Sequence, residues 1–290
     1  MKKYIILIPI YNDRESLTKL IENINSDIEG INSEISIIVI NDASSQQIID
    51  EYQNIENIRS FEIINMKENR GHARCIASGL KYIYEKKEFD YVIPMDGDGE
   101  DRPEEIKNFI QIAEQSNEQS IVGERVKRSE SLFFKFCYQF HKLLTLTFTG
   151  QSIKFGNFTC LSKSTVEKML KEKSTWNSFS GSLKKTEKNL LSIQSIRGAR
   201  YFGPSKMSFF NLLKHSLSII SVFRKIVLIR SAFFIVFYIL LIKNNASIIT
   251  SIPLVLLLVM IYSISSLALR ENMSEFDASL SNIHDIEEIK

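Results

Sequence analysis

Two long apolar segments in the second half of the chain constrain its fold more than any other feature of the sequence. Residues 226–242 carry one charged side chain, Arg230, and residues 246–269 carry none. A helix that crosses a bilayer needs about 20 apolar residues. The second segment is long enough, and the first becomes so with the residues before it. A pair of buried core helices in a soluble protein is the alternative. We expect a two-helix transmembrane hairpin with a turn at Asn244 and Asn245.

The charges around these segments predict their orientation. Residues 188–270 contain ten Lys or Arg and no Asp or Glu. Arg224 and Lys225 precede the hairpin and Arg270 follows it, whereas the turn holds Lys243. Lys and Arg are enriched in cytoplasmic loops. We therefore expect a multi-pass membrane protein with two spans, whose soluble part and both termini are cytoplasmic.

The segments that flank the hairpin differ in character. Residues 207–225 mix Phe and Leu with Asn, Lys and Ser, which predicts an amphipathic helix lying in the headgroup layer. An ordinary amphipathic helix packed on the soluble part is the alternative. Residues 270–290 are acidic and polar, and we expect them to form a loosely ordered cytoplasmic tail.

Residues 1–206 have the pattern of one cytosolic α/β domain. Apolar runs that predict strands cover 4–9, 35–41, 61–65 and 91–95. Segments with helical periodicity lie between and after them, at 13–28, 46–55, 72–86 and 103–115. Strands without polar alternation, separated by helices, predict a mainly parallel, Rossmann-like sheet with helices on both faces.

Composition excludes several classes of protein. Lys and Arg number 36 and Asp and Glu 34, so the formal charge is +2. This near-balance argues against a nucleic-acid-binding protein. The three cysteines, Cys75, Cys137 and Cys160, are far apart, which excludes a disulfide framework and a Cys-based zinc site.

Polar groups follow each of the four predicted strands. In open α/β sheets the ligand binds beyond the carboxyl ends of the strands. The residues at these ends are Tyr11 to Asp13, Asn41 to Ser45, Asn69 to Gly71 and Asp96 to Asp101. We expect them to line one binding site.

The acidic group after the fourth strand carries the strongest chemical signal. Asp96 and Asp98 are two residues apart, and Gly97 and Gly99 let the backbone bend around them. Carboxylate oxygens suit Mg²⁺ or Mn²⁺, which bridge protein carboxylates to substrate phosphates. An acidic surface turn is the alternative. The position directly after an apolar strand favours a metal site.

Five motifs together resemble a known family. They are IPIYND at 8–13, VINDAS at 39–44, NRGHARCIASGL at 69–80, PMDGDGEDRPEEI at 94–106 and RGARYFGPSKM at 197–207. The sequence resembles the family 2 glycosyltransferases with the GT-A fold, nearest to their dolichyl-phosphate-mannose-synthase-like branch. The paired apolar segments resemble those of bacterial bactoprenyl-phosphate glycosyltransferases. Nearly the whole chain is covered by this resemblance.

The resemblance implies roles for particular residues. The nucleotide would contact Pro9, Tyr11, Asp13, Asp42 and Asp96, and the metal would be held by Asp96, Asp98 and Glu100. The donor diphosphate and the acceptor phosphate would be bound by Arg125, Arg128, Arg200, Ser205 and Lys206. Asp96, Asp98, Arg125 and Arg200 would act in catalysis.

Some positions depart from the family pattern. Glu100 stands where Gln is usual, and Asp13 replaces the common Glu. Residues 156–158 read Gly-Asn-Phe, where an Asp-Phe-Arg type of segment is expected.

The sequence therefore predicts an inverting glycosyltransferase that needs Mg²⁺ or Mn²⁺. It would move one sugar from a nucleotide sugar to a polyprenyl phosphate at the cytoplasmic membrane face, and it could form a homo-oligomer. Two alternatives stay open. One is a membrane-tethered transferase acting on another envelope acceptor, and the other is a non-catalytic scaffold that binds nucleotide sugars.

Overall fold

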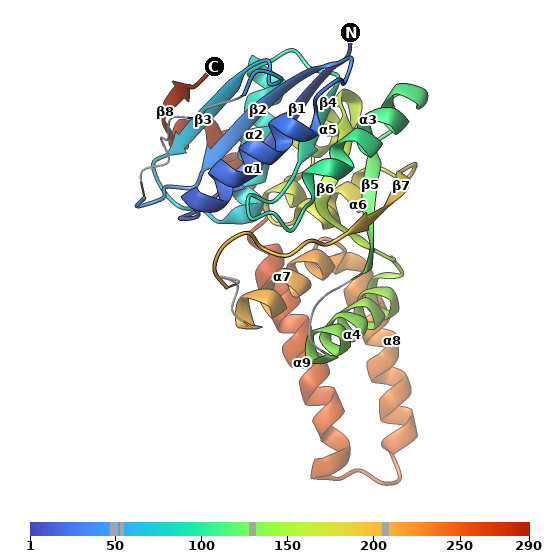
Figure 1. Ribbon diagram of the computed structural model, residues 1–290. Helices are drawn as coiled ribbons and strands as arrows, with labels where there is room; N and C mark the ends of the chain where they lie inside the picture. Colours follow the sequence, from blue (N-terminus) through green and yellow to red (C-terminus); the bar gives the residue numbers. More distant parts are fainter. Residues whose placement is uncertain (47–51, 53–54, 128–131, 205–208) are drawn as a thin grey trace.

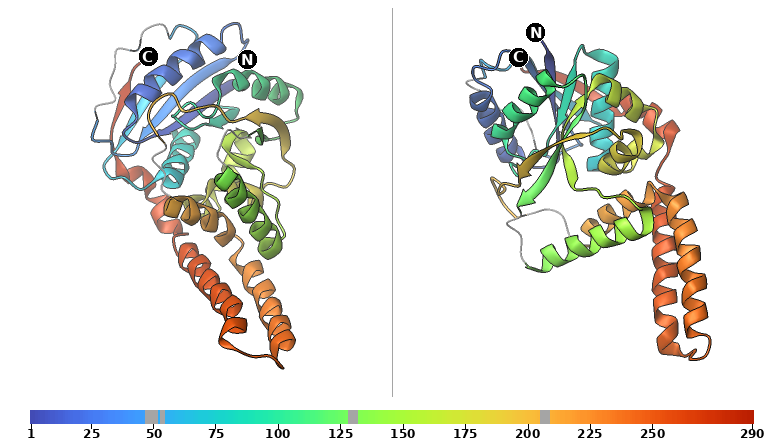
Figure 2. Two further views of the ribbon diagram at one scale, coloured as in Figure 1. Left: turned by 60° about the horizontal axis from the view of Figure 1, so that its bottom comes forward. Right: turned by 90° about the vertical axis from the view of Figure 1, so that its right-hand side faces the viewer.

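A computed structural model describes residues 1–46, 52, 55–127, 132–204 and 209–290. The chain forms a sheet domain, a layer of two helices beneath it, and a helical hairpin that extends away from both (Figure 1). Two further views show the two termini on the sheet domain, at the opposite end from the hairpin tip (Figure 2).

The sheet domain is built on one mixed sheet of eight strands, whose order is β7-β5-β6-β4-β1-β2-β3-β8. Strands β4, β1, β2 and β3 are parallel, whereas β6 and β8 run antiparallel to their neighbours. The strands are β1 Lys3–Ile10, β2 Glu34–Asn41, β3 Phe61–Met66, β4 Tyr91–Pro94, β5 Ile121–Lys127, β6 Phe155–Ser162, β7 Leu191–Ile196 and β8 Ile283–Glu288.

Helices cover both faces of this sheet and form the lower parts of the molecule. Those of the sheet domain are α1 Arg14–Asp27, α2 His72–Lys86, α3 Ile106–Gln115, α5 Lys163–Leu170, α6 Phe179–Thr186 and α10 Met273–Asp277. Short 3₁₀ helices lie at Pro103–Glu105, Lys173–Trp176 and Ser279–Asn282. The lower layer consists of α4 Leu132–Thr149 and α7 Phe209–Ser221, and the hairpin of α8 Arg224–Ile242 and α9 Ile248–Ala268.

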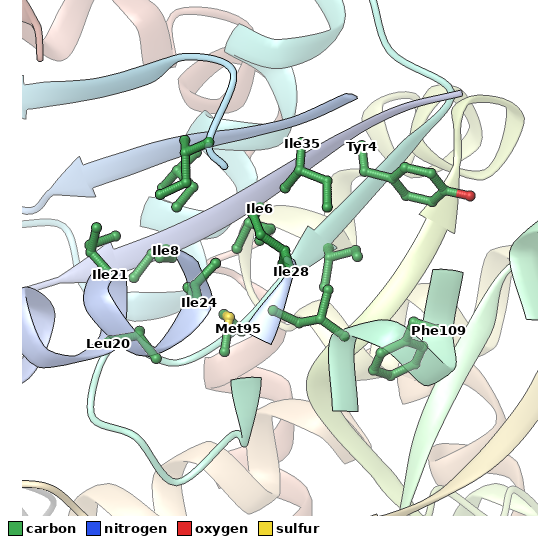
Figure 3. Close-up of a cluster of buried hydrophobic side chains, with 14 of the residues drawn as sticks. Tyr4, Ile6, Ile8, Leu20, Ile21, Ile24, Ile28, Ile35, Met95 and Phe109 are labelled. Atoms are coloured by element: carbon green, nitrogen blue, oxygen red, sulfur yellow. The ribbon is translucent and has the colours of Figure 1, made fainter. Parts of the chain in front are cut away.

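The core on one face of the sheet shows why the first elements form. Leu17, Leu20, Ile21 and Ile24 recur at helical spacing along α1, and all four are fully buried. They pack with alternate residues of β1 in one apolar cluster (Figure 3). Each buried side chain of this size contributes roughly 1.5–3 kcal/mol relative to exposure. The predicted alternation of apolar strands and helices is confirmed for these elements.

The helix expected over 46–55 lies largely outside the described residues. The prediction of a loosely ordered tail over 270–290 is wrong. This segment contains α10 and the edge strand β8, which pairs with β3. Phe276 of α10 is buried and stacks on Trp176, with 5.4 Å between ring centroids.

The hairpin exposes its apolar side chains. Phe233 and Ile248 are 74% and 88% exposed, although both helices are long and apolar enough to cross a membrane. Buried core helices would hide such side chains, so the alternative of a soluble core pair does not fit this arrangement. A small apolar cluster joins the hairpin to the layer above it through Val227, Ile264 and Ile220 of α7.

Candidate functional site

The carboxyl ends of β1, β2, β3 and β4 form one edge of the sheet, here called the carboxyl edge, and the predicted polar groups meet there. Asp42 follows β2 and is buried; its two oxygens accept hydrogen bonds from the backbone N–H groups of Arg70 and Gly71, each at 2.9 Å. Burial raises the pKa of Asp42, and these two bonds oppose the rise. Asp42 thus fastens the end of β2 to the loop after β3.

The end of β1 contributes both a buried and an exposed group. Pro9 is buried within the strand, whereas Tyr11 is 49% exposed. Asn12 has a φ of +52°, and its side-chain oxygen accepts a hydrogen bond from the backbone N–H of Ser45 at 2.9 Å. The loops after β1 and β2 are therefore tied together beside an open tyrosine ring.

Asp96 is held by two polar side chains that come from other elements. Its Oδ1 lies 3.3 Å from Nε2 of His72 and 3.2 Å from Nδ2 of Asn157. Nδ2 of Asn157 also lies 2.7 Å from the His72 ring nitrogen. Burial favours a high pKa for Asp96, but His72 and Arg125 outweigh it and hold this pKa well below its usual range.

Two further carboxyl groups in the same turn have the opposite tendency. Burial and the neighbouring Asp96 raise the pKa of Asp98 to about 6, despite two arginines nearby. The same two causes raise the pKa of Asp101 to about 7, although Arg125 lies 3.5 Å away and opposes the rise. Burial and the nearby charge of Asp96 thus both favour the protonated forms of Asp98 and Asp101.

Residues 197–204, here called the covering loop, supply those two arginines. Arg197 pairs with Glu100. Arg200 pairs with Asp98 and also donates to Oδ2 of Asp13 at 2.6 Å. The side chains of Arg200, Asp98 and Asp13 are 15–18% exposed, so all three are mostly withdrawn from water.

Backbone contacts hold the covering loop against the turn after β4. The N–H groups of Gly198 and Tyr201 donate to the carbonyls of Glu100 and Asp98, at 2.8 and 3.0 Å. The Tyr201 ring lies so close to Gly99 that an added Cβ there would come within 2.5 Å of it. Gly99 also has a φ of +85°, a conformation that side chains other than glycine rarely adopt.

Arg125 approaches the same turn from β5. Its guanidinium leaves no room for a side chain at Gly156, where a Cβ would lie 2.8 Å from Nη2. The Gly at 156 and the Asn at 157, which depart from the family pattern, therefore serve this site. Gly156 makes space for Arg125, and Asn157 contacts Asp96.

The turn after β4 offers carboxylate oxygens, the kind of ligand that a divalent cation takes. Mg²⁺ is usually held by one or two carboxylates together with substrate phosphates. Asp96 and Asp98 supply such oxygens, and a cation would offset both the burial and the repulsion from Asp96 that raise the pKa of Asp98. Glu100 is turned toward Arg197 instead. Within the described ranges, no three His, Cys, Asp or Glu side chains are grouped as a metal site of protein ligands alone requires.

The structure thus brings together most of the predicted site residues. Asp13, Asp96, Asp98, Glu100, Arg125 and Arg200 meet around the turn after β4, and Pro9, Tyr11 and Asp42 lie on the neighbouring strand ends. Arg128, Ser205 and Lys206 lie outside the described residues. Asp101 was expected only as part of the acidic turn. Sequence reasoning gave His72 and Asn157 no role in the site, because their contacts with Asp96 arise only in the fold.

Comparison with known proteins gives a family match and a set of relatives. A family model described as glycosyl transferase family 2 matches residues 5–173. The undecaprenyl-phosphate 4-deoxy-4-formamido-L-arabinose transferase of Photorhabdus laumondii is 29% identical over 229 residues. The enzyme of the same name from Proteus mirabilis is 28% identical over 228 residues. Each alignment covers 73% of this chain and 65% of the relative, so the chain spans less than two thirds of these relatives' length.

Solved structures share the fold at low sequence identity. A mannosyltransferase from Pyrobaculum calidifontis, in complex with GDP-Man and Mn²⁺, has a TM-score of 0.52 and 10% identity. That match covers 97% of this chain and 87% of the other. A glucosyl-3-phosphoglycerate synthase from Mycobacterium tuberculosis, with Mn²⁺, UDP and phosphoglyceric acid, has a TM-score of 0.55 and 13% identity over 78% of each chain.

Proposed function

Because the chain belongs to glycosyl transferase family 2, we propose that it transfers one sugar from a nucleotide sugar to a polyprenyl phosphate at a membrane surface. The curated relatives are named as undecaprenyl-phosphate sugar transferases, which supports a lipid phosphate as the acceptor. The two structural neighbours hold nucleotides and Mn²⁺, which supports a nucleotide-sugar donor and a divalent cation.

One observation carries this proposal. Helix α7 lies between the sheet domain and the hairpin: it packs on α6, where an added Cβ at Gly181 would lie 3.2 Å from the carbonyl oxygen of Ile219. Helix α7 in turn packs on the apolar hairpin through Leu217 and Ile220. A donor site at the carboxyl edge would therefore face an acceptor whose head group arrives at the level of α7.

The acceptor determines what chemistry the protein must supply. A hydroxyl acceptor needs a base that removes its proton. A lipid monophosphate is already an anion at neutral pH. Its oxygen attacks the anomeric carbon, forms the new C–O bond and inverts the configuration, while the nucleoside diphosphate leaves with the electrons of the broken bond. The protein then has to align two phosphate groups and neutralise their charge.

The residues of the carboxyl edge suit that task. Pro9, Tyr11 and Asp42 lie where a nucleoside would contact the ends of β1 and β2. A cation held by Asp96 and Asp98 would, when bound, supply positive charge against the diphosphate. Arg197 and Arg200 now pair with carboxylates, and each can exchange that partner for a phosphate oxygen of the donor.

The membrane placement belongs to the same proposal. Helices α8 and α9 would cross the bilayer, and α7 would lie in the headgroup layer. Helix α4 would lie beside it, since it packs on α8 and exposes Phe140, Leu143 and Leu146. The sheet domain and both termini would then be cytoplasmic.

The test is a transfer assay with the full chain in detergent or native membranes. A panel of radiolabelled nucleotide sugars is offered with polyprenyl phosphate. We expect an organic-extractable product that mild acid hydrolyses. Chelator should abolish its formation, and Mn²⁺ or Mg²⁺ should restore it. Asp98→Asn should lower turnover at least 100-fold, because it removes a charge at the donor site.

Glu167→Gln is the matched control, since Glu167 is a half-buried acid of α5 that pairs with Lys171. It should leave turnover unchanged. Label recovered only in a saccharide or in another glycolipid would contradict the acceptor assignment. Full activity in excess chelator would contradict the requirement for a divalent cation.

A further inference from the structure

The segment that leads into the hairpin is attached to the sheet domain at a buried polar contact. Trp176 ends the 3₁₀ helix that precedes α6, and Asn177 is the next residue; both side chains are buried. Nδ2 of Asn177 donates to Oγ of Ser221 at 3.0 Å, in a bond that is withdrawn from water. Ser221 ends α7, shortly before α8 begins at Arg224. Asn177 therefore holds the chain just before it enters the hairpin.

The segment that leaves the hairpin is attached at the neighbouring residue. Residues 269–272 separate α9 from α10. In α10, Phe276 stacks on the ring of Trp176, and Glu275 accepts a hydrogen bond from the indole Nε1 of Trp176 at 2.9 Å. Two consecutive residues of the sheet domain thus hold both ends of the hairpin. This cluster is here called the hairpin anchor, and it consists of Trp176, Asn177, Ser221, Glu275 and Phe276.

Helix α2 connects the hairpin anchor with the acidic turn. The guanidinium of Arg74 lies 5.1 Å from the centroid of the Trp176 ring, and its Nη2 lies 3.2 Å from Oε2 of Glu275. His72, at the start of the same helix, lies 3.3 Å from Asp96. The two contacts are less than one helical turn apart. The distance from the hairpin anchor to the donor site is therefore set by a rigid element.

The proposed reaction makes this distance important. The attacking oxygen has to come within about 3–3.5 Å of the reacting carbon, and a displacement of about 1 Å can lower the rate roughly 100-fold. The acceptor lipid and the hairpin would both be held by the bilayer, whereas the donor is bound by the sheet domain. A flexible join between domain and hairpin would spread the donor site over many heights. The buried contacts of the hairpin anchor are the opposite of such a join.

We propose that Trp176 and Asn177 are positioning residues, which hold the donor site at one height above the bilayer so that it meets the phosphate of a lipid acceptor. This assignment rests on the proposed function and extends it to residues remote from the acidic turn. An acceptor dissolved in water can reach the donor site at any height. The hairpin anchor should therefore matter for an acceptor held in the membrane and not for a soluble one.

The experiment compares two acceptors with the full chain in lipid vesicles. One is polyprenyl phosphate in the same bilayer, and the other is a short, water-soluble isoprenyl monophosphate. The double variant Asn177→Ala and Phe276→Ala removes one contact at each end of the hairpin. Its kcat/KM for polyprenyl phosphate should fall roughly 10-fold, while its kcat/KM for the soluble acceptor and its KM for the nucleotide sugar stay at the wild-type values. Phe276→Leu should keep most of the activity, because it keeps an apolar side chain at this position.

Phe89→Ala is the matched control for a loss of stability. Phe89 is a buried aromatic residue that precedes β4, at the end of the sheet away from the carboxyl edge. Its removal leaves a cavity in the core, so this variant should unfold at a lower temperature without favouring either acceptor. An equal loss of transfer to both acceptors in the double variant would overturn the proposal. Wild-type transfer to polyprenyl phosphate in the double variant would also overturn it.

A second measurement does not depend on transfer. Spin labels are attached through Lys19→Cys on α1 and Asn244→Cys in the hairpin turn, both at exposed side chains, in a background without the native cysteines. The distribution of distances between the labels should be broader in the double variant than with the intact hairpin anchor, and an unchanged distribution would overturn the proposal. Failure of the wild-type protein to use polyprenyl phosphate would contradict the proposed function, and the label distances would still show whether the hairpin anchor fixes the sheet domain.

Discussion

Arg200 contacts two carboxylates, one after the first and one after the last of the four parallel strands in sequence order. Asp13 follows β1 and Asp98 follows β4, and the guanidinium joins them. A lysine could not do this equally well, because a planar guanidinium offers several donors in a fixed arrangement. The covering loop is thereby fixed over the turn that a donor diphosphate would approach.

We expect Arg200→Ala to lower kcat/KM for the nucleotide sugar by at least 10-fold. Hydrogen bonds to charged groups contribute about 1.5–3 kcal/mol, and two mostly buried carboxylates would lose their shared cation. Arg200→Lys should recover part of the loss, because it keeps the charge without the fork. The measurement is initial-rate kinetics with the lipid acceptor at saturation.

Arg102→Ala provides the comparison for this variant. Arg102 lies near the same loop and pairs with Glu104, but both side chains are more than a third exposed. Such pairs contribute little, so this variant should keep wild-type kinetics. Wild-type turnover in Arg200→Ala would show that the two ion pairs of Arg200 have no part in transfer.

At the residue scale, the sequence alone does not predict polar contacts between distant segments of the chain. Asp96 and Asp98 could be recognised, because an acidic turn after an apolar strand has a local signature. Asn157 and His72 have none, since their positions 85 residues apart in the chain become meaningful only when β6 and α2 meet at Asp96. Arg200 and Asp98 are 102 residues apart in the chain, so their pairing could not be predicted from the sequence either.

At the scale of elements, the contacts of Arg230 explain why the first apolar segment carries one charged side chain. Its Nη1 donates to the carbonyl of Thr147 at 2.8 Å, at the C-terminal end of α4. Gly150 follows α4 with a φ of +72°, and a Cβ there would lie 2.7 Å from the Arg230 guanidinium. Charged residues in membrane helices are often paired with backbone carbonyls in this way. The contact ties α4 to the hairpin.

Arg230→Met should therefore loosen the end of α4 without unfolding the sheet domain. A lost hydrogen bond of about 1 kcal/mol predicts roughly fivefold faster hydrogen exchange in the last turns of α4. Gly150→Ala should act in the same direction, because it strains the backbone and displaces the guanidinium. Exchange in α1 and β2 is the internal control. Unchanged exchange in α4 for both variants would refute the coupling.

The elements differ in how far the sequence predicts them. Strands β1 to β4 are predictable because they are mostly apolar runs. Helices α8 and α9 are predictable because each is longer and more apolar than a helix in a soluble core needs to be. Strand β8 has no such signal, because an edge strand buries little of its surface and Ile283 and Ile286 are its only isoleucines. Its stability comes from pairing with β3, some 220 residues earlier.

For the molecule as a whole, the position of β8 bears on membrane topology. The hairpin lies between β3 and β8 in the sequence, yet the two strands are paired in one sheet. Any membrane crossings between them must therefore be even in number. The pairing agrees with the charge distribution of the sequence, which predicts that both ends of the hairpin are cytoplasmic.

We expect reporter fusions before Met1 and after Lys290 to respond as cytoplasmic. A reporter placed within residues 243–245 should respond as external, because this turn joins the far ends of α8 and α9. The measurement is a paired set of enzymes active on opposite sides of the membrane. A C-terminal reporter on the far side would exclude the two-span arrangement and the pairing of β8 with β3 in the membrane-inserted protein.

The pairing of β3 with β8 also orders events during synthesis. A ribosome makes β1 to β7 first, then the apolar helices α8 and α9, and then β8, which pairs with β3 at the edge of the sheet. Until that strand returns, the backbone of β3 presents an unpaired edge that can recruit strands of other chains. Synthesis of the apolar hairpin thus precedes completion of the sheet. A chain that ends before β8 would therefore keep the edge of β3 unpaired.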